Sequence, residues 1–228
     1  MPPEIRVISS MATRQLLADL VARFESTSSQ RVHVESVGGV DAAKRVKAGE
    51  AFDAVVLAAN AIDDLIAAGK IVGNRVDIVK SGVAIAVRAG ATRPDIGSEE
   101  AVRNAVLAAR TLGYSTGPSG VQLAKLFERW GIAEQIKSRI VQAPPGVPVG
   151  TLVARGEVEL GFQQLSELMS LPGIDVLGPL PSAIQIITTF SGGVAKASTQ
   201  PEAVRALLAF MTSTAVTRIK QDNGMETV

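Results

Sequence analysis

The stretch Ile5-Arg6-Val7-Ile8-Ser9-Ser10-Met11-Ala12 decides the fold, because an apolar strand ends in small residues and leads directly into an amphipathic helix. We expect this helix from about Thr13 to Phe24, since apolar residues recur there at helical spacing. Its stripe consists of Leu16, Leu17, Leu20, Val21 and Phe24.

The same order occurs twice more along the chain. The strand-like run 32–37 leads through Gly38-Gly39-Val40 into a helix that we expect Asp41 to open. The run 111–114 leads through Ser115-Thr116-Gly117-Pro118 into a helix from about Ser119. A helix N-terminus presents unpaired N–H groups and the positive end of a dipole. Serine hydroxyls and bare glycine backbone let an anion approach those groups, so the pattern predicts a small-anion site without metal or cofactor.

Strand-like runs alternate with helical segments along the rest of the chain, which predicts an α/β fold with helices on both faces of mixed sheets. Asn60 is expected to cap one helix, 183–191 to form a long strand, and the proline-rich stretch 142–148 to be irregular. Two long extended segments, near 76–87 and 183–195, bracket a middle section with its own strands and helices.

We therefore expect two lobes joined by two crossing strands. Lobe 1 is discontinuous and consists of 1–82 plus 188–228, and lobe 2 is an insertion, 83–187, with a ligand cleft between the lobes. The alternative from the pattern alone is a single doubly wound sheet.

Composition excludes several classes of function. The chain has 228 residues, is 46% hydrophobic and carries a formal net charge of +1, so it can bury a core but offers no electrostatic basis for binding nucleic acid. Aromatic residues make up only 4%, which also disfavours base stacking. The absence of cysteine excludes disulfides, thiolate catalysis and cysteine-ligated zinc.

Neither a transmembrane run nor a basic-then-apolar leader is present in the sequence. Two interpretations of location stay open: a periplasmic protein whose signal peptide was removed, or a cytoplasmic one. We expect no membrane insertion, and a monomer.

Several segments together resemble the type II periplasmic substrate-binding proteins, in particular the molybdate-binding branch. The matching stretches are Val7 to Phe24, Gly38 to Leu57, Gly113 to Lys125, Thr151 to Glu167 and the end near Asn223-Gly224-Met225. Within them, Lys47-Ala48-Gly49 followed by Phe52-Asp53-Ala54-Val55, and the turn Gly117-Pro118-Ser119-Gly120, resemble family segments.

The resemblance implies two α/β lobes, a hinge of two strands and an anion clamped by hinge closure. It also shows departures from the molybdate binders. Ala12 stands where that branch has a serine, Gly38-Gly39 replaces a Ser-Ser turn, and Gln164 stands at a tyrosine position. Fewer hydroxyls leave more room, so the expected ligand is a small organic carboxylate rather than molybdate.

The resemblance gives three functional hypotheses. The first is a solute-binding protein that delivers a small anion to an ABC permease. The second is an isomerase, because an aconitate isomerase is related to the same branch, and a 1,3-proton shift needs a carboxylate clamp and one proton-shuttling base. The third is a cytoplasmic ligand sensor.

Candidate ligand-binding residues come from the turns before the helices and from the polar end of the strand 158–164, where α/β proteins bind ligands. For the serines, helix capping is the alternative role, and for Arg14 it is simple solvation. The full set is Ser9, Ser10, Met11, Arg14, Gly38, Gly39, Val40, Ser119, Gly120, Val147, Gln163, Gln164 and Ser166.

No catalytic residue is assigned from the sequence. His33 is the only histidine, and a lone histidine on a strand is more often structural or exposed than a base. Scattered carboxylates around a single histidine form no metal cluster, so no metal and no cofactor are expected.

Overall fold

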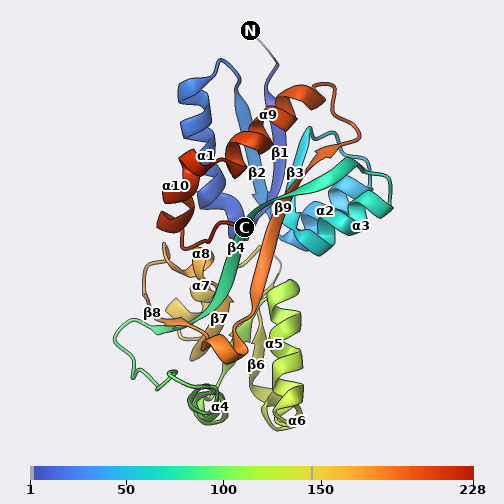
Figure 1. The fold of residues 1–228 in the computed structure, drawn as a ribbon. Coiled ribbons are helices and arrows are strands. Elements are labelled where there is room, and N and C mark those ends of the chain that lie inside the picture. Colours follow the sequence, from blue (N-terminus) through green and yellow to red (C-terminus); the bar gives the residue numbers. More distant parts are fainter. Residues whose placement is uncertain (1–2, 145) are drawn as a thin grey trace. The chain divides into compact units, whose positions relative to one another are not determined.

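In the computed structural model, which describes residues 3–144 and 146–228, the chain forms two compact units (Figure 1). Unit 1 consists of residues 1–81 and 188–228, and unit 2 of residues 82–187. The strands β4 (Ile71–Arg88) and β9 (Ile187–Ala195) carry the chain from one unit to the other. The predicted α/β class is confirmed.

Unit 1 is built on parallel strands that each lead into a helix. The strand order is β2-β1-β3-β9-β4, with β1 parallel to β2 and β3, and β9 antiparallel to β3. Besides β4 and β9, its elements are β1 (Ile5–Ser10), η1 (Met11–Thr13), α1 (Arg14–Thr27), β2 (Val32–Val37), α2 (Gly39–Lys47), β3 (Ala54–Ala58), α3 (Ala59–Ala67), α9 (Pro201–Thr212), η4 (Thr214–Val216) and α10 (Thr217–Asp222).

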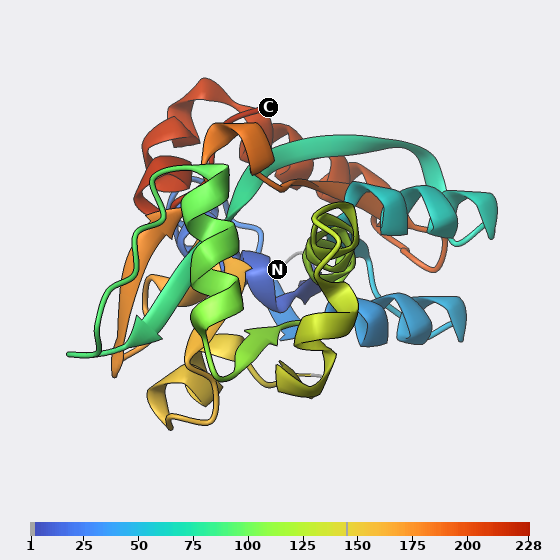
Figure 2. The same ribbon diagram turned by 90° about the horizontal axis from the view of Figure 1, so that it is seen from below.

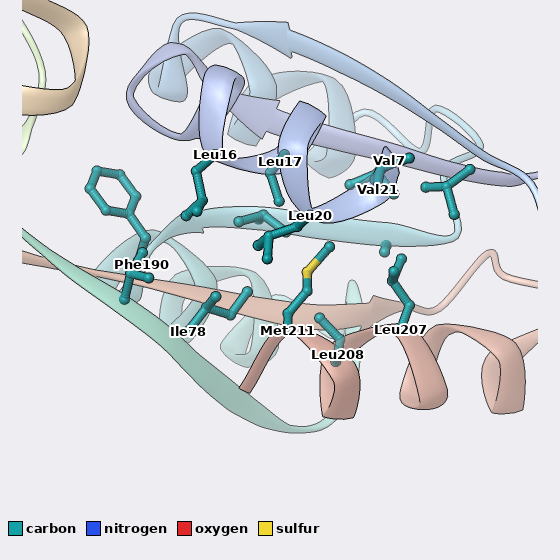
Figure 3. Close-up of a cluster of buried hydrophobic side chains, with 14 of the residues drawn as sticks. Val7, Leu16, Leu17, Leu20, Val21, Ile78, Phe190, Leu207, Leu208 and Met211 are labelled. Carbon is teal, nitrogen blue, oxygen red and sulfur yellow. The ribbon is translucent and has the colours of Figure 1, made fainter. Parts of the chain in front are cut away.

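Helices cover both faces of the unit 1 sheet. The apolar stripe of α1 packs with α9 on one face, where Leu20 and Met211 point toward one another (Figure 3). On the other face, α2 and α3 pack against Ile8, Val55 and Leu57. Because β3 is covered on both faces, all five of its residues are apolar and buried, as a buried strand requires, and β1 is buried at every position except Arg6.

The C-terminal segment forms hydrogen bonds with β4. Lys220 of α10 is only 2% exposed, and its Nζ donates to the carbonyl oxygen of Ile78 at 2.9 Å. Burial lowers the pKa of this ammonium group. The backbones of Lys80 and Glu226 exchange a further pair of hydrogen bonds, each of 2.9 Å.

Unit 2 has a second mixed sheet. β5 pairs in parallel with β6 and β7, while β4 runs antiparallel to β7 and β8. Its elements are α4 (Glu99–Ala108), β5 (Leu112–Tyr114), α5 (Pro118–Arg129), α6 (Ala133–Ile136), η2 (Lys137–Arg139), β6 (Ile140–Gln142), α7 (Val149–Ala154), β7 (Leu160–Gln164), α8 (Leu165–Leu168), β8 (Ile174–Pro179) and η3 (Ser182–Ile184).

The helices of unit 2 also take opposite faces. α4 and α5 share one apolar cluster, in which Phe127 packs edge-on against Tyr114 and Phe162. The two helices cross steeply, since α5 is seen lengthwise and α4 end-on in Figure 1, and the reverse holds in Figure 2. α7 and α8 pack in the remaining clusters, against strand residues that include Ala84 and Ala86.

Several expected element ends are wrong. α2 begins at Gly39 rather than Asp41, and α3 begins at Ala59, so Asn60 lies inside the helix instead of capping it. The expected strand 183–191 is a 3₁₀ turn followed by β9 from Ile187. Between them, Gln185 Oε1 accepts from the backbone N–H groups of Val83 and Ile186. Of the stretch 142–148, Gln142 ends β6, and Pro145 lies outside the described residues.

Candidate functional site

The carboxyl ends of the parallel strands in unit 1 meet at one edge of its sheet. Ser9 pairs in register with Ser36 and with Val56, and Ser10 pairs with Val37. η1 and α3 each start at the residue after the end of such a strand, and α2 starts two residues after the end of β2. This edge therefore gathers helix N-termini, which is where α/β proteins bind ligands.

Ser10 is the most distinctive side chain at this edge. The residue is 7% exposed, and its Oγ has no hydrogen-bond partner within residues 3–144 and 146–228. Ser9, by contrast, lies 2.7 Å from Ser36 through the two Oγ atoms. The alternative role raised from the sequence, capping of the first helix, does not hold for Ser10, whose side chain forms no capping bond within the described chain. Its hydroxyl is thus the one left for a ligand.

The first turn of α2 lies beside Ser10. A Cβ placed on Gly39 would lie 3.5 Å from the Cβ of Ser10, which is ordinary contact. Gly38 is the N-cap of α2, its carbonyl accepts from the N–H of Ala42 at 2.9 Å, and in the described structure no side chain of the cap satisfies the first N–H groups. Neither glycine has a positive φ, so the backbone conformation of the turn does not demand glycine.

The other predicted residues of unit 1 lie around this turn. Met11 is partly buried in η1, Val40 is 48% exposed as the second residue of α2, and Arg14 is exposed as the first residue of α1. His33 is exposed on β2, away from the carboxyl end of the strand.

In unit 2 the parallel strands β5, β6 and β7 likewise end at one edge. Gln163 and Gln164 close β7 and are each 3% exposed, although glutamine is usually a surface residue. Gln164 is the N-cap residue of α8, and Ser166 is partly buried in that helix.

A hydrogen-bonded chain ties this strand end to a carboxyl group. The N–H of Gly150 in α7 donates to Gln163 Oε1 at 3.2 Å, and Gln163 Nε2 donates to Glu167 Oε1 at 2.8 Å. Burial raises the pKa of Glu167 to about 7, against a smaller opposing effect of the Gln163 hydrogen bond. A pKa of about 7 means that the Glu167 carboxyl is held protonated or ionised by small changes around neutral pH.

The start of α5 is held by a close backbone contact. A Cβ on Gly120 would lie 1.8 Å from the carbonyl oxygen of Ser115, so only glycine fits there. Gly117, rather than Ser119, is the N-cap residue, and Ser119 is 8% exposed in the first turn. A cavity of about 270 Å³ lies alongside, lined among others by Tyr114, Ser115, Gly120 and Lys125.

Val147 is the last predicted residue of unit 2. It precedes α7 in an irregular segment, where its N–H donates to the carbonyl of Pro144 at 3.0 Å. This N–H is already used, so Val147 offers a ligand only its side chain and carbonyl.

Within each unit the structure thus brings some of the predicted residues together. Ser10 lies against Gly39 in unit 1, and in unit 2 Gln163 is hydrogen-bonded to Glu167, a polar residue at the end of this strand that the set of thirteen candidates did not include. The available signal was a carboxylate placed four residues after a glutamine at the end of an apolar strand. Its altered pKa, however, arises from burial, which a residue pattern does not contain.

Two further properties of the described chain bear on function. No group of three or more His, Cys, Asp or Glu side chains in residues 3–144 and 146–228 is placed to hold a metal ion. Over the same residues, no helix is long and apolar enough to cross a membrane.

Comparison with protein families gives a match over nearly the whole chain. The profile of the bacterial extracellular solute-binding proteins matches residues 5–226. An aconitate isomerase of a Pseudomonas species is 35% identical over 233 residues, which cover 98% of this chain and 88% of that protein.

Solved structures share the fold at lower identity. The periplasmic molybdate-binding protein of Azotobacter vinelandii superposes with a TM-score of 0.81 at 16% identity, covering 99% of this chain and 100% of that one. The sulfate-binding protein of Mycobacterium tuberculosis gives a TM-score of 0.80 at 14% identity, covering 100% and 88%. At these identities the likeness concerns the fold alone.

Proposed function

Because the chain belongs to the bacterial extracellular solute-binding proteins, we propose that it binds a small organic acid with more than one carboxylate, of the aconitate class. One observation carries this proposal. The Ser10 hydroxyl is buried without a partner in the described structure, and it lies beside an α2 N-terminus whose first N–H groups no cap side chain satisfies. Such groups remain costly until an anion accepts their hydrogen bonds.

An organic acid fits these turns better than a tetrahedral metal oxyanion does. The Gly38-Gly39 turn supplies backbone N–H groups and space but no hydroxyls, whereas the molybdate binders that this chain resembles use hydroxyls in a tight shell. The 35% identical relative carries the name of an enzyme whose substrate is a tricarboxylate, which supports the same ligand class.

A thermal-shift and calorimetry panel tests the proposal. The ligands are cis-aconitate, trans-aconitate, citrate, molybdate, tungstate and sulfate, at one protein concentration. A ligand at 100 times its Kd stabilises the native state by about 2.7 kcal/mol, which raises the thermal midpoint measurably. We expect a shift with at least one organic acid; a shift with molybdate and with no carboxylate refutes the ligand class.

A second candidate function is isomerisation of the bound acid, and the identity to an aconitate isomerase is the observation that favours it. Incubation of the protein with cis-aconitate, followed by proton NMR, separates a catalyst from a binder. Appearance of the trans isomer above the uncatalysed rate supports the enzyme, and binding without conversion supports a transport role.

The transport role implies a place and a partner. We propose that the binder acts outside the cytoplasmic membrane and hands its ligand to an ABC permease, as its family supports. Fractionation of cells that express the full gene product tests the location, and loss of acid uptake on deletion of that gene tests the partner. Retention of the protein in the cytoplasm would count against both.

A further inference from the structure

We propose that unit 2 has a second ligand site, a cavity that binds a small apolar α-amino acid through both of its charges. Arg88 binds the carboxylate of this ligand, and Glu157 binds its ammonium group. Every residue that lines the cavity belongs to unit 2, so its ligand is independent of the acid proposed for the Ser10 edge of unit 1.

The cavity lies at the edge of the unit 2 sheet where β5 and β7 begin and the antiparallel β4 ends. Gln163 and Gln164, at the carboxyl end of β7, therefore lie at the opposite edge of this sheet. The cavity has a volume of about 540 Å³, which is within the range of small-molecule sites. Val87 and Val158, 2% and 0% exposed, are part of its lining, so it can take a short apolar side chain.

Arg88 brings a positive charge without a partner to this cavity. Its guanidinium group has no hydrogen bond and no ion pair among the residues that the structure describes. Its backbone is held in place, because its carbonyl accepts from the N–H of Ala91 and the N–H of Ala89 donates to Gly173, both at 3.0 Å. A Cβ on Gly156 would lie 3.6 Å from Arg88 Nη1, so the guanidinium group lies beside this glycine. A cation is thus positioned at the cavity but not neutralised.

Glu157 brings a negative charge that is only weakly paired. Its side chain lies 3.9 Å from Nη1 of Arg155, which is too long for a hydrogen bond, and both side chains are exposed. Exposed ion pairs of this kind contribute little free energy. Although Glu157 and Arg88 line the same cavity, no ion pair joins them in the described structure. The space between the two charges is therefore open to a ligand.

The other two charges of the lining neutralise one another. Glu159 Oε2 accepts from the backbone N–H of Arg110 at 2.8 Å and from its Nε at 3.1 Å. The N–H of Glu159 in turn donates to the hydroxyl of Thr111 at 2.9 Å. This pair closes the cavity at the start of β5 and β7, and it leaves Arg88 and Glu157 as the groups that select the ligand.

A ligand with a single charge does not match this lining. An anion at Arg88 also meets the Glu157 carboxylate, and a cation at Glu157 also meets the Arg88 guanidinium group, so a like charge opposes each of them. An α-amino acid presents each of its charges to the opposite one. Its carboxylate suits the two parallel N–H donors of an arginine, and its ammonium group suits a carboxylate.

An NMR titration that follows the backbone amide signals tests the site. It compares L-valine with N-acetyl-L-valine, which lacks the ammonium group, and with L-valinamide, which lacks the carboxylate. Addition of each ligand to about 10 mM detects a Kd of about 1 mM. We expect L-valine to shift the signals of Gly156 and Val158. Each blocked analogue should bind at least about tenfold more weakly, because it leaves one charge of the cavity unpaired.

Two variants each remove one of the charges. Arg88→Gln and Glu157→Gln alter exposed side chains on which no described hydrogen bond depends, so both should fold, and each should lose at least about tenfold in affinity for L-valine. Arg93→Gln and Glu100→Gln are the matched controls, since they remove exposed charges of the same unit that do not line the cavity. Both controls should bind L-valine as the wild type does.

The outcomes separate this site from the one in unit 1. Ser10→Ala should leave the binding of L-valine unchanged. Absence of shifts with L-valine, equal binding of the blocked analogues, wild-type affinity of R88Q, or loss of L-valine binding in S10A overturns the inference. If a variant fails to fold, the blocked analogues decide the same question with the wild-type protein. A protein that binds L-valine in the cavity but none of the organic acids refutes the proposed function and supports this inference.

Discussion

Two turns that lead from a strand into a helix both contain glycine: the turn from β2 to α2 in unit 1 and the turn from β5 to α5 in unit 2. The glycines of these two turns have different structural roles. Gly120 is required by packing, since a Cβ there would lie 1.8 Å from the Ser115 carbonyl oxygen. Gly39 is under no such constraint, because its Cβ would meet Ser10 at an ordinary 3.5 Å. In unit 2 the glycine beside the helix start is therefore required by packing. In unit 1 it leaves space for a ligand to approach the N–H groups of the helix.

The strongest test of this contrast is Gly120→Ala. The added methyl cannot fit against a backbone carbonyl, so β5 and α5 must separate, and we expect a loss of about 3 kcal/mol in unfolding free energy. Gly117→Ala is the matched control, because its Cβ would lie 3.6 Å from Ser115 Oγ. Denaturant unfolding of both variants measures the difference. Equal stability would show that the turn relaxes easily and that the contrast is false.

The next effect concerns the polar groups at the two sheet edges. The raised pKa of Glu167, about 7 against an ordinary 4.5, means that the native state binds more protons than the unfolded chain between these values. Stability should therefore fall by about 1–3 kcal/mol as pH rises from 4.5 to 7, and E167Q should lack this component. Unfolding of both proteins at pH 5 and pH 8 measures it. Parallel pH dependence would contradict the prediction. Ser10 carries no charge, so it gives unit 1 no comparable change of unfolding free energy with pH.

Gly39→Ala tests the unit 1 glycine in the same comparison. The methyl group fits, so the thermal midpoint of the free protein should change little, but it intrudes on the approach to the N–H groups of α2. We expect affinity for the organic acid to fall about tenfold, or about 1.4 kcal/mol. Calorimetry measures this loss. Unchanged affinity would mean that the α2 turn does not touch the ligand.

The smallest expected effect belongs to Ser10→Ala. Removing a buried hydroxyl that has no partner in the described chain should raise the unfolding free energy of the free protein, by up to about 1 kcal/mol. The same change should weaken ligand binding. Ser9→Ala is the control, since the Ser9 hydroxyl pairs with Ser36 and its loss should destabilise the protein. A destabilised S10A variant would show that the hydroxyl has a structural partner.

Sequence patterns predicted the α/β class and the order of the main elements, because hydrophobic periodicity records which face of an element is buried. They misplaced helix starts for a specific reason. Asp41 and Asn60 were chosen as N-caps by residue type, whereas Gly38 and Ala58 occupy those positions without a capping side chain in the described structure. Capping rules assume that the side chain of the N-cap residue accepts a hydrogen bond from the first N–H groups of the helix. In the described structure α2 and α3 have no such bond.

Tertiary contacts explain what else escaped prediction. β8 went unnoticed because five of its six residues are only partly buried, Pro179 is exposed, and the strand lacks a strong hydrophobic pattern. The titration of Glu167 depends on burial and on Gln163, which no local pattern encodes. The ligand-binding role of the thirteen candidate residues stays a prediction, and the Gly39 and Ser10 variants above test it for two of them.

The place of β9 in the chain has a consequence for synthesis of the protein. Unit 2 ends at residue 187, whereas unit 1 needs β9 between β3 and β4, and β9 begins only there. On the ribosome, the inserted unit is therefore complete before the unit that surrounds it. Until β9, residues 187–195, has emerged, β3 presents an unpaired apolar edge. We therefore expect chaperones to bind nascent chains that are stalled before β9 has emerged.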